Sequence, residues 1–265
     1  MIKKIINKFL KIFLHFGYKV SINKISSNID YILFDKNSWS PYLLRKKNKY
    51  FNYYNEGIIN SKSVSSDSFS KQIRYYSLLQ LASQVIKESD YENFAECGCW
   101  RGHSSYSICK MLTENNFNKK FYIFDSFEGG LSEKVSKDYS INRYKQNIKD
   151  SEDQKNYFSS DYIQTKELFN QFSFVNIYKG WIPNKFYKVK DIKFSFVHID
   201  VDLYEPTLNS LNFFFKRLVN QGIIVCDDYN YSDFPGAKIA VDEFIKNNKI
   251  KFFYEVPLGG CIIIK

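Results

Sequence analysis

Three aspartates in two short acidic runs are the residues of this chain with the clearest capacity for chemistry. Asp200 lies in VHIDVDLY (197–204), and Asp227 and Asp228 lie in GIIVCDDY (222–229), each just after the apolar residues of an expected strand. A helical pattern connects the two runs, and a right-handed connection of this kind places its strands in one parallel sheet. If the strands are neighbours, about 4.8 Å apart, the three carboxylates converge at the carboxyl edge of the sheet, where open α/β sheets bind ligands.

Carboxylates brought this close together repel one another. At about 4 Å and an effective dielectric constant near 20, each like-charged pair costs on the order of 4 kcal/mol. Raised pKa values, a basic side chain or a bound cation must offset this repulsion. A set of oxygen ligands suits magnesium, with manganese or calcium as alternatives, and argues against zinc. We therefore predict a metal site formed by Asp200, Asp227 and Asp228, against the alternative that these residues only cap helices and strand ends.

A glycine-containing loop, ECGCWRGHSS (96–105), indicates a second site. Gly98 and Gly102 allow the backbone to approach a ligand closely, and the helix that follows offers unpaired N–H groups. The spacing E-x-G-x-x-x-G differs from the G-x-G-x-x-G of dinucleotide sites and fits a ligand without a pyrophosphate, such as S-adenosylmethionine. Asp125 ends the next expected strand, where a carboxylate would accept both ribose hydroxyls. Loop and aspartate together favour a nucleoside-type ligand.

The elements that must position these residues follow an alternating pattern. From residue 91 onward short apolar runs alternate with helical patterns, which is typical of a parallel, doubly wound α/β sheet. PLGG (257–260) predicts a hairpin between the last two strands, and the long polar stretch 132–161 predicts a lid or acceptor loop. The expected strands are 93–97, 121–124, 175–179, 194–199, 223–226, 252–256 and 261–264, and the expected helices are 69–88, 103–114, 162–172, 206–218 and 237–247.

Six motifs, specific when taken together, carry a resemblance to a known family. They are FAECGCWRGHSS (94–105), FYIFDSFEGG (121–130), KGWIP (179–183), VHIDVDLYEPT (197–207), GIIVCDDY (222–229) and PGAKIAVDEF (235–244). In this order and spacing they resemble the macrocin-O-methyltransferase (TylF/MycF) family, which includes sugar methyltransferases of antibiotic biosynthesis. The resemblance covers about residues 69–265, is poor at 132–161 and does not extend to the first 65 residues.

This resemblance implies a class I methyltransferase (Rossmann-like) fold with a seven-stranded sheet, S-adenosylmethionine as the methyl donor, and Mg²⁺ held by Asp200, Asp227 and Asp228. The family usually reads FEGLP where this chain has FEGGL (127–131). The identity of the acceptor is therefore the property that can least be carried over from the family to this chain. The implied cofactor contacts are Glu96, Gly98, Trp100, Arg101, Gly102, Ser104, Asp125 and Ser126.

The expected reaction is methyl transfer to a hydroxyl group of a sugar, with Asp200 acting through the metal. The metal would lower the pKa of the hydroxyl, and a base would take its proton, a role worth about 10²–10⁴-fold. Asp202 is the first candidate for the base because period-two geometry puts it on the same strand face as Asp200. His103, in the glycine loop, is the other candidate. A catechol-like acceptor fits the same metal chemistry, whereas RNA is less favoured because the basic residues are spread along the chain.

The overall composition is that of a globular protein with a positive charge. The 265 residues carry a net charge of +10, which admits anionic partners: a nucleotide-sugar, a phospholipid surface or nucleic acid. We expect a sugar, nucleotide-sugar or glycan acceptor and no nucleic acid partner. The five cysteines form no C-x-x-C pair and no zinc spacing, which suits a reducing cytosol. We expect a cytoplasmic bacterial enzyme whose methyltransferase domain, 66–265, follows an N-terminal region, 1–65.

Residues 1–20 predict a short, basic amphipathic helix, with apolar residues at helical spacing and lysines on another face. This stretch is too short and too often interrupted by lysine to span a bilayer, which needs about 20 apolar residues, and it lacks a signal-peptide cleavage site. Two interpretations stay open. The helix contacts an anionic membrane surface, or it packs against the domain or a second subunit of a homo-oligomer.

Overall fold

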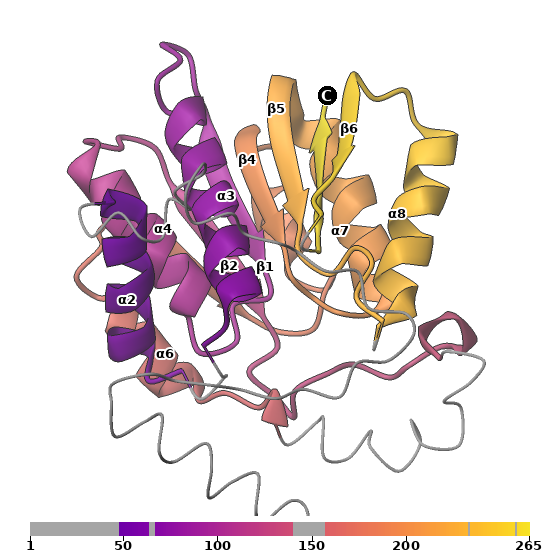
Figure 1. Ribbon diagram of the computed structural model, residues 1–265, viewed down its shortest axis with the longest axis horizontal. Coiled ribbons are helices and arrows are strands. Elements are labelled where there is room, and N and C mark those ends of the chain that lie inside the picture. Colours follow the sequence, from indigo (N-terminus) through magenta and orange to yellow (C-terminus); the bar gives the residue numbers. More distant parts are fainter. Residues whose placement is uncertain (1–47, 64–66, 140–156, 233, 258) are drawn as a thin grey trace, which may run out of the picture. The chain divides into compact units, whose positions relative to one another are not determined.

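The computed structural model describes residues 48–63, 67–139, 157–232, 234–257 and 259–265, which form a seven-stranded sheet in the order β3-β2-β1-β4-β5-β7-β6 (Figure 1). The strands β1 to β5 are parallel to one another, and β7 is antiparallel to both β5 and β6. The expected doubly wound sheet with a C-terminal hairpin is therefore confirmed. The strands are β1 (Asn93–Cys97), β2 (Phe121–Asp125), β3 (Val175–Lys179), β4 (Phe194–Ile199), β5 (Leu218–Cys226), β6 (Phe252–Glu255) and β7 (Cys261–Ile264).

Helices cover the two faces of this sheet. One core cluster contains side chains of α2, α3, α4 and α6, and the other contains side chains of α7 and α8, so the two groups of helices lie on opposite faces. The helices are α2 (Lys49–Ser61), α3 (Phe69–Val85), α4 (His103–Glu114), α6 (Tyr162–Phe169), α7 (Tyr204–Arg217) and α8 (Pro235–Asn247).

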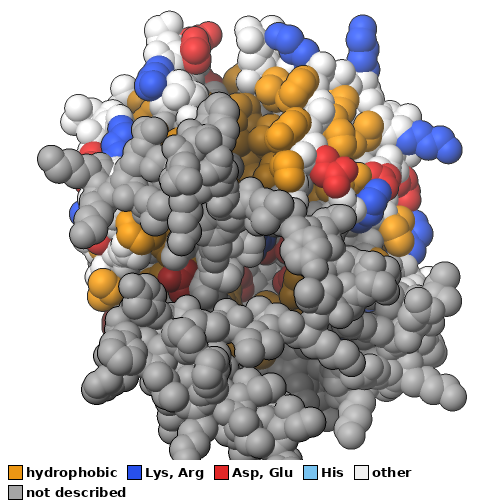
Figure 2. All heavy atoms as spheres, viewed as in Figure 1, with side chains coloured by type: hydrophobic (Ala, Val, Ile, Leu, Met, Phe, Trp, Pro, Cys, Tyr) orange, Lys and Arg blue, Asp and Glu red, His pale blue; other side chains and the backbone are white. Residues whose placement is uncertain are grey.

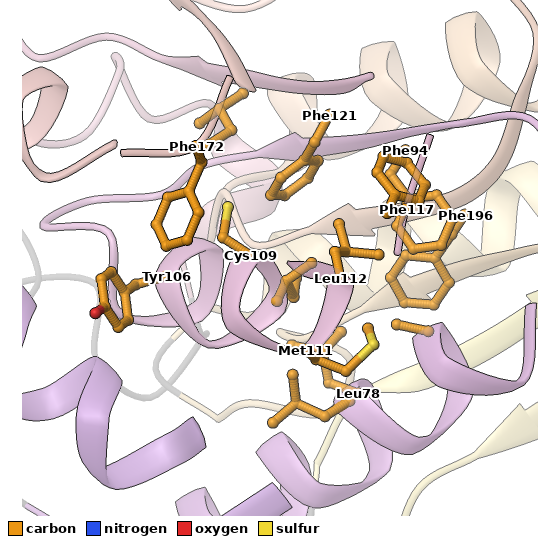
Figure 3. Packing of buried hydrophobic residues seen from close by; sticks show 14 of the residues in the cluster. Leu78, Phe94, Tyr106, Cys109, Met111, Leu112, Phe117, Phe121, Phe172 and Phe196 are labelled. Carbon is orange, nitrogen blue, oxygen red and sulfur yellow. The ribbon is translucent and has the colours of Figure 1, made fainter. Parts of the chain in front are cut away.

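The central strands are buried on both faces, as expected for a parallel sheet. Phe94 and Phe196 project toward the α3 and α4 side, where their ring centroids lie 5.1 Å apart, while their chain neighbours Ala95 and Val197 belong to the opposite cluster. Figure 3 shows this packing, with Met111 of α4 beside the sheet phenylalanines. The alternation fixes the register of β1 and β4, whose carboxyl ends carry the candidate site residues.

The C-terminal strands leave apolar side chains on the surface. Figure 2 shows hydrophobic side chains gathered over β5, β7 and β6. Cross-strand neighbours form two rows of apolar side chains on β6 and β7, because Phe252 pairs with Ile264 and Tyr254 pairs with Ile262. Phe252 is 50% exposed and Tyr254 47% exposed.

The helix α2 was not expected from the sequence. Asn48 caps it by accepting a hydrogen bond from the Tyr50 N–H at 2.9 Å, and Tyr53 and Tyr54 are buried. A Cβ at Gly57 would lie 2.4 Å from Ser107 Oγ of α4, so only glycine allows this close helix crossing. Aromatic and polar residues dominate KYFNYYNEGIINS, and a helix this short gains most of its stability from packing on α4.

The other elements agree with the sequence predictions to within a few residues. The largest difference is β5, which begins at Leu218, directly after α7, rather than at residue 223. Residues 1–20 and most of the 132–161 loop (140–156) lie outside the described residues. Within the described ranges no helix has the length and apolar character needed to cross a membrane.

Candidate active site

A pocket at the carboxyl ends of β1, β2 and β4 brings together many of the predicted site residues. It contains about 740 Å³ of space between protein atoms, part of which is open to solvent. Trp181 and Phe158 add aromatic walls. Six predicted residues line it: Gly98, Trp100, Asp125, Ser126, Asp200 and Asp202.

The glycine loop has a conformation that its sequence requires. Gly98 has φ +83°, and a Cβ there would lie 1.7 Å from the backbone oxygen of Asp200. Gly102 has φ +86°, and a Cβ there would meet the Phe169 ring at 3.0 Å. The sequence interpretation assigned these glycines to ligand approach. The structure shows that each is also needed for close contact within the protein, Gly98 with the end of β4 and Gly102 with α6.

Asp125 organises the same loop. Its Oδ2 accepts hydrogen bonds from the N–H groups of Cys99 and Trp100, both at 2.8 Å, and its Oδ1 accepts one from Phe127 N–H at 3.0 Å. Burial raises the pKa of Asp125, and these backbone hydrogen bonds partly oppose the shift. Ser126 follows at the pocket wall and accepts a hydrogen bond from Glu128 N–H at 3.4 Å. The contact of Asp125 with ribose hydroxyls stays a prediction.

The expected acid cluster forms at the ends of β4 and β5. Asp200, Asp227 and Asp228 each place one carboxylate oxygen within 4.8 Å of the others. Burial, followed by repulsion from neighbouring carboxylates, raises the pKa of Asp200 and of Asp228 well above its usual range. The Asp202 N–H donates to Asp228 Oδ2 at 2.8 Å, and Asp202 itself has φ +61° and a pKa raised in the same way. This set of oxygens is suited to a hard divalent cation.

Two basic residues of α3 face this cluster, and the sequence interpretation missed both. The Arg74 Nη1 donates to Asp227 Oδ2 in an ion pair. Burial lowers the pKa of Lys71, and the negative charge of Asp200 opposes this shift. The two residues stand three positions apart on one side of α3, so the available signal was the i, i+3 spacing of two cations.

Glu96 lies below the loop and does not line the pocket. It is fully buried, its Oε2 accepts a hydrogen bond from Ser105 Oγ, and its Oε1 pairs with His198 Nδ1 at 2.8 Å. Ser104, also predicted as a cofactor contact, is buried at the start of α4 outside the pocket lining. Arg101 lines a separate polar hollow beside Lys62.

His103, the alternative base, is not brought to the pocket either. Its ring packs against those of Tyr54 and Tyr75, with centroids at 4.8 and 4.4 Å, and its Nε2 is 3.0 Å from the backbone oxygen of Tyr54. Burial lowers its pKa to about 3, which keeps the ring neutral. Its position fits packing of α2 and α3 on α4.

Comparisons with known proteins identify a family and related folds. Residues 63–255 match the family described as macrocin-O-methyltransferase (TylF). Among solved structures, the O-methyltransferase NovP is 20% identical with a TM-score of 0.58, over 72% of this chain and 79% of NovP. The calicheamicin methyltransferase CalS11 is 13% identical with a TM-score of 0.55, over 92% and 99%.

A putative caffeoyl-CoA O-methyltransferase from Staphylococcus aureus is 17% identical with a TM-score of 0.51, over 84% of this chain and 95% of that protein. At these identities the structural likeness shows the fold. A search of curated protein sequences gives no match.

Proposed function

Because this chain belongs to the macrocin-O-methyltransferase family and is thus an S-adenosylmethionine-dependent O-methyltransferase, we propose that it methylates a sugar hydroxyl with the help of a divalent cation. The observation that carries the proposal is the meeting of three carboxylates from two strand ends within 4.8 Å of one another. This cluster stands beside the pocket formed by the glycine loop, since Asp200 lines that pocket.

The residues present fit both absent groups. The acid cluster offers only oxygen ligands, and Asp200 and Asp228 have raised pKa values because burial and repulsion from neighbouring carboxylates leave their charge poorly compensated. In the pocket, the Trp100 indole N–H is buried and has no acceptor among the described residues, which suits a polar ligand group. We infer that the 98–100 loop, Asp125 and Ser126 hold S-adenosylmethionine, and that Asp200, Asp227 and Asp228 hold Mg²⁺.

Three features of the site would then contribute to the reaction: the metal site, Asp202 and the pocket walls. A bound Mg²⁺ would supply Lewis acidity that lowers the pKa of a coordinated hydroxyl. Asp202 lines the same pocket, and the hydrogen bond from its N–H to Asp228 fixes its backbone. Its carboxylate would accept the proton of the acceptor hydroxyl. The pocket walls would hold the methyl donor and the acceptor oxygen in line, where positioning supplies most of the acceleration.

A sugar is the acceptor best supported, because the macrocin-O-methyltransferase family includes sugar methyltransferases of antibiotic biosynthesis. The structural neighbour CalS11 is described as a calicheamicin methyltransferase. We further propose that this sugar is part of a nucleotide-sugar or a bacterial surface glycan, which the net charge of +10 would favour. A catechol-like small molecule is the competing acceptor.

The test is methyl transfer from labelled S-adenosylmethionine into pools of nucleotide-sugars, extracted glycans and catechols, with and without a chelator. We expect incorporation into the sugar pools that the chelator abolishes and excess Mg²⁺ restores. Asp227→Ala should remove this activity, and Asp242→Ala should keep it, because Asp242 pairs with Lys238 and Tyr229 at the surface. Full activity of Asp227→Ala, or in chelator, would refute the metal role, and incorporation into catechols alone would refute the sugar acceptor.

A further inference from the structure

The acid cluster already holds a positive charge of the protein itself. Arg74 Nη1 donates to Asp227 Oδ2, and the side chains of this pair are only 27% and 19% exposed. The same guanidinium interacts electrostatically with Asp200 and Asp228. Arginine stays charged at every working pH, so this contact is a permanent counter-charge at one of the three predicted ligands.

A guanidinium and a divalent cation cannot both use this carboxylate well. An N–H in contact with Asp227 Oδ2 occupies one of the lone-pair sites of the carboxylate, and the guanidinium charge repels a cation held by the same group. In the metal-free protein the pairing is favourable because three carboxylates otherwise repel one another. Arg74 should therefore stabilise the empty site and oppose its filling.

Arg74 approaches the acid cluster from the α3 side. It lies in a groove between α3 and the turn before β7, together with Asp227, Gly259 and Gly260. A Cβ at Gly259 would be 3.7 Å from Arg74 Cδ, an ordinary contact distance, so this turn lies directly beside the arginine stem. Asp200, in contrast, lines the pocket of the glycine loop. Arg74 thus reaches the cluster from a groove distinct from the proposed cofactor pocket.

We propose that Arg74 is an internal counter-ion that occupies the Asp227 arm of the cluster in the metal-free enzyme and releases it when a divalent cation binds. This inference rests on the proposed metal site. Arg74 acts as a positioning residue: it holds Asp227 in place before the metal arrives and sets how tightly the metal binds.

The test is direct binding of Mn²⁺ to the full-length protein. Binding is measured by isothermal titration calorimetry and by the loss of the electron paramagnetic resonance signal of the free ion. Arg74→Gln should bind Mn²⁺ at least about tenfold more tightly than the unaltered protein, which corresponds to about 1.4 kcal/mol. Arg217→Gln is the matched control, because Arg217 donates to Lys190 O and Phe213 O away from the cluster, and its affinity should not change.

Equal or weaker binding by Arg74→Gln would overturn the inference. A lack of Mn²⁺ binding by the unaltered protein would instead overturn the metal site, so the two failures are distinguishable. If Arg74→Gln does not fold, crystals of the unaltered protein grown with and without Mn²⁺ decide the matter. The contact between Arg74 and Asp227 should be present only without the ion, and a contact that persists beside bound Mn²⁺ would contradict the proposal.

Discussion

The substitution Gly98→Ala should be the most damaging single-methyl change in the glycine loop. The new Cβ would lie 1.7 Å from the Asp200 backbone oxygen, well inside any real contact distance, and backbone atoms cannot move aside as a flexible side chain can. The position also has φ +83°, which costs a residue other than glycine about 1–2 kcal/mol. Overpacking of a tight site adds about 1–3 kcal/mol.

The two contributions sum to a loss of about 2–5 kcal/mol in the free energy of unfolding. Gly129→Ala separates them, because Gly129 has φ +66° but a Cβ there would meet nothing within 4 Å, so only the backbone cost of about 1–2 kcal/mol applies. Urea unfolding followed by circular dichroism measures both losses. Because relief of the clash would push the Asp200 backbone away from β1, Gly98→Ala should also weaken Mn²⁺ binding, whereas Gly129→Ala should not.

Equal losses of stability in the two variants would refute this reasoning, since they would mean that the contact with Asp200 carries no cost. Retention of full Mn²⁺ affinity in a folded Gly98→Ala protein would refute the second part. It would show that the Asp200 carboxylate keeps its place when the backbone beneath it is displaced.

Three further substitutions test other parts of the structure. Asp228→Asn should raise the stability of the metal-free protein by about 1–3 kcal/mol, because it removes one poorly compensated buried charge, and should lower Mn²⁺ affinity; lower stability in urea would contradict this. Gly236→Ala should lower stability by about 1–3 kcal/mol, because its Cβ would lie 1.8 Å from the buried Asp138 Oδ1; an unchanged urea midpoint would count against the packing described. His103 has a folded pKa of about 3, below its unfolded value near 6.5, so the unfolded state binds more protons and stability is lost as the pH falls from 6.5 toward 3. His103→Asn should remove this contribution, of up to about 1.4 kcal/mol per pH unit, and a difference in stability that is constant between pH 4 and 7 would contradict it.

The sheet and most of its helices could be predicted because local patterns are strong there. β1, β3, β4 and β7 agree with the expected residues at both ends, since apolar runs bounded by polar turns leave little freedom. The acid cluster could also be predicted, because strand order and handedness put Asp200 and Asp227 at one edge. The strand bounds thus depend on local patterns, and the position of the acid cluster depends on the handedness of one βαβ unit.

What could not be predicted depends on contacts between distant segments. Nothing near Arg74 in the sequence points to Asp227, which lies 153 positions later. Similarly, His103 stands next to a glycine of the loop, but the helix α2 covers it, and that helix gains its stability from the contact. Glu96 has the residue type of a ligand contact, yet its partner His198 holds it beneath the loop. In each case a partner far along the chain decides where the side chain points.

The edge that carries the proposed metal site also concentrates buried charges that repel one another. At the ends of β4 and β5, burial penalises the charges of Asp200, Asp202 and Asp228 before neighbouring carboxylates add repulsion. A fold selected for stability alone would replace them with neutral residues of similar size. The ion pair between Arg74 and Asp227 offsets part of the repulsion within the cluster. The remaining negative charge is what a divalent cation would neutralise, so the property that weakens the metal-free protein is the one that the proposed reaction requires.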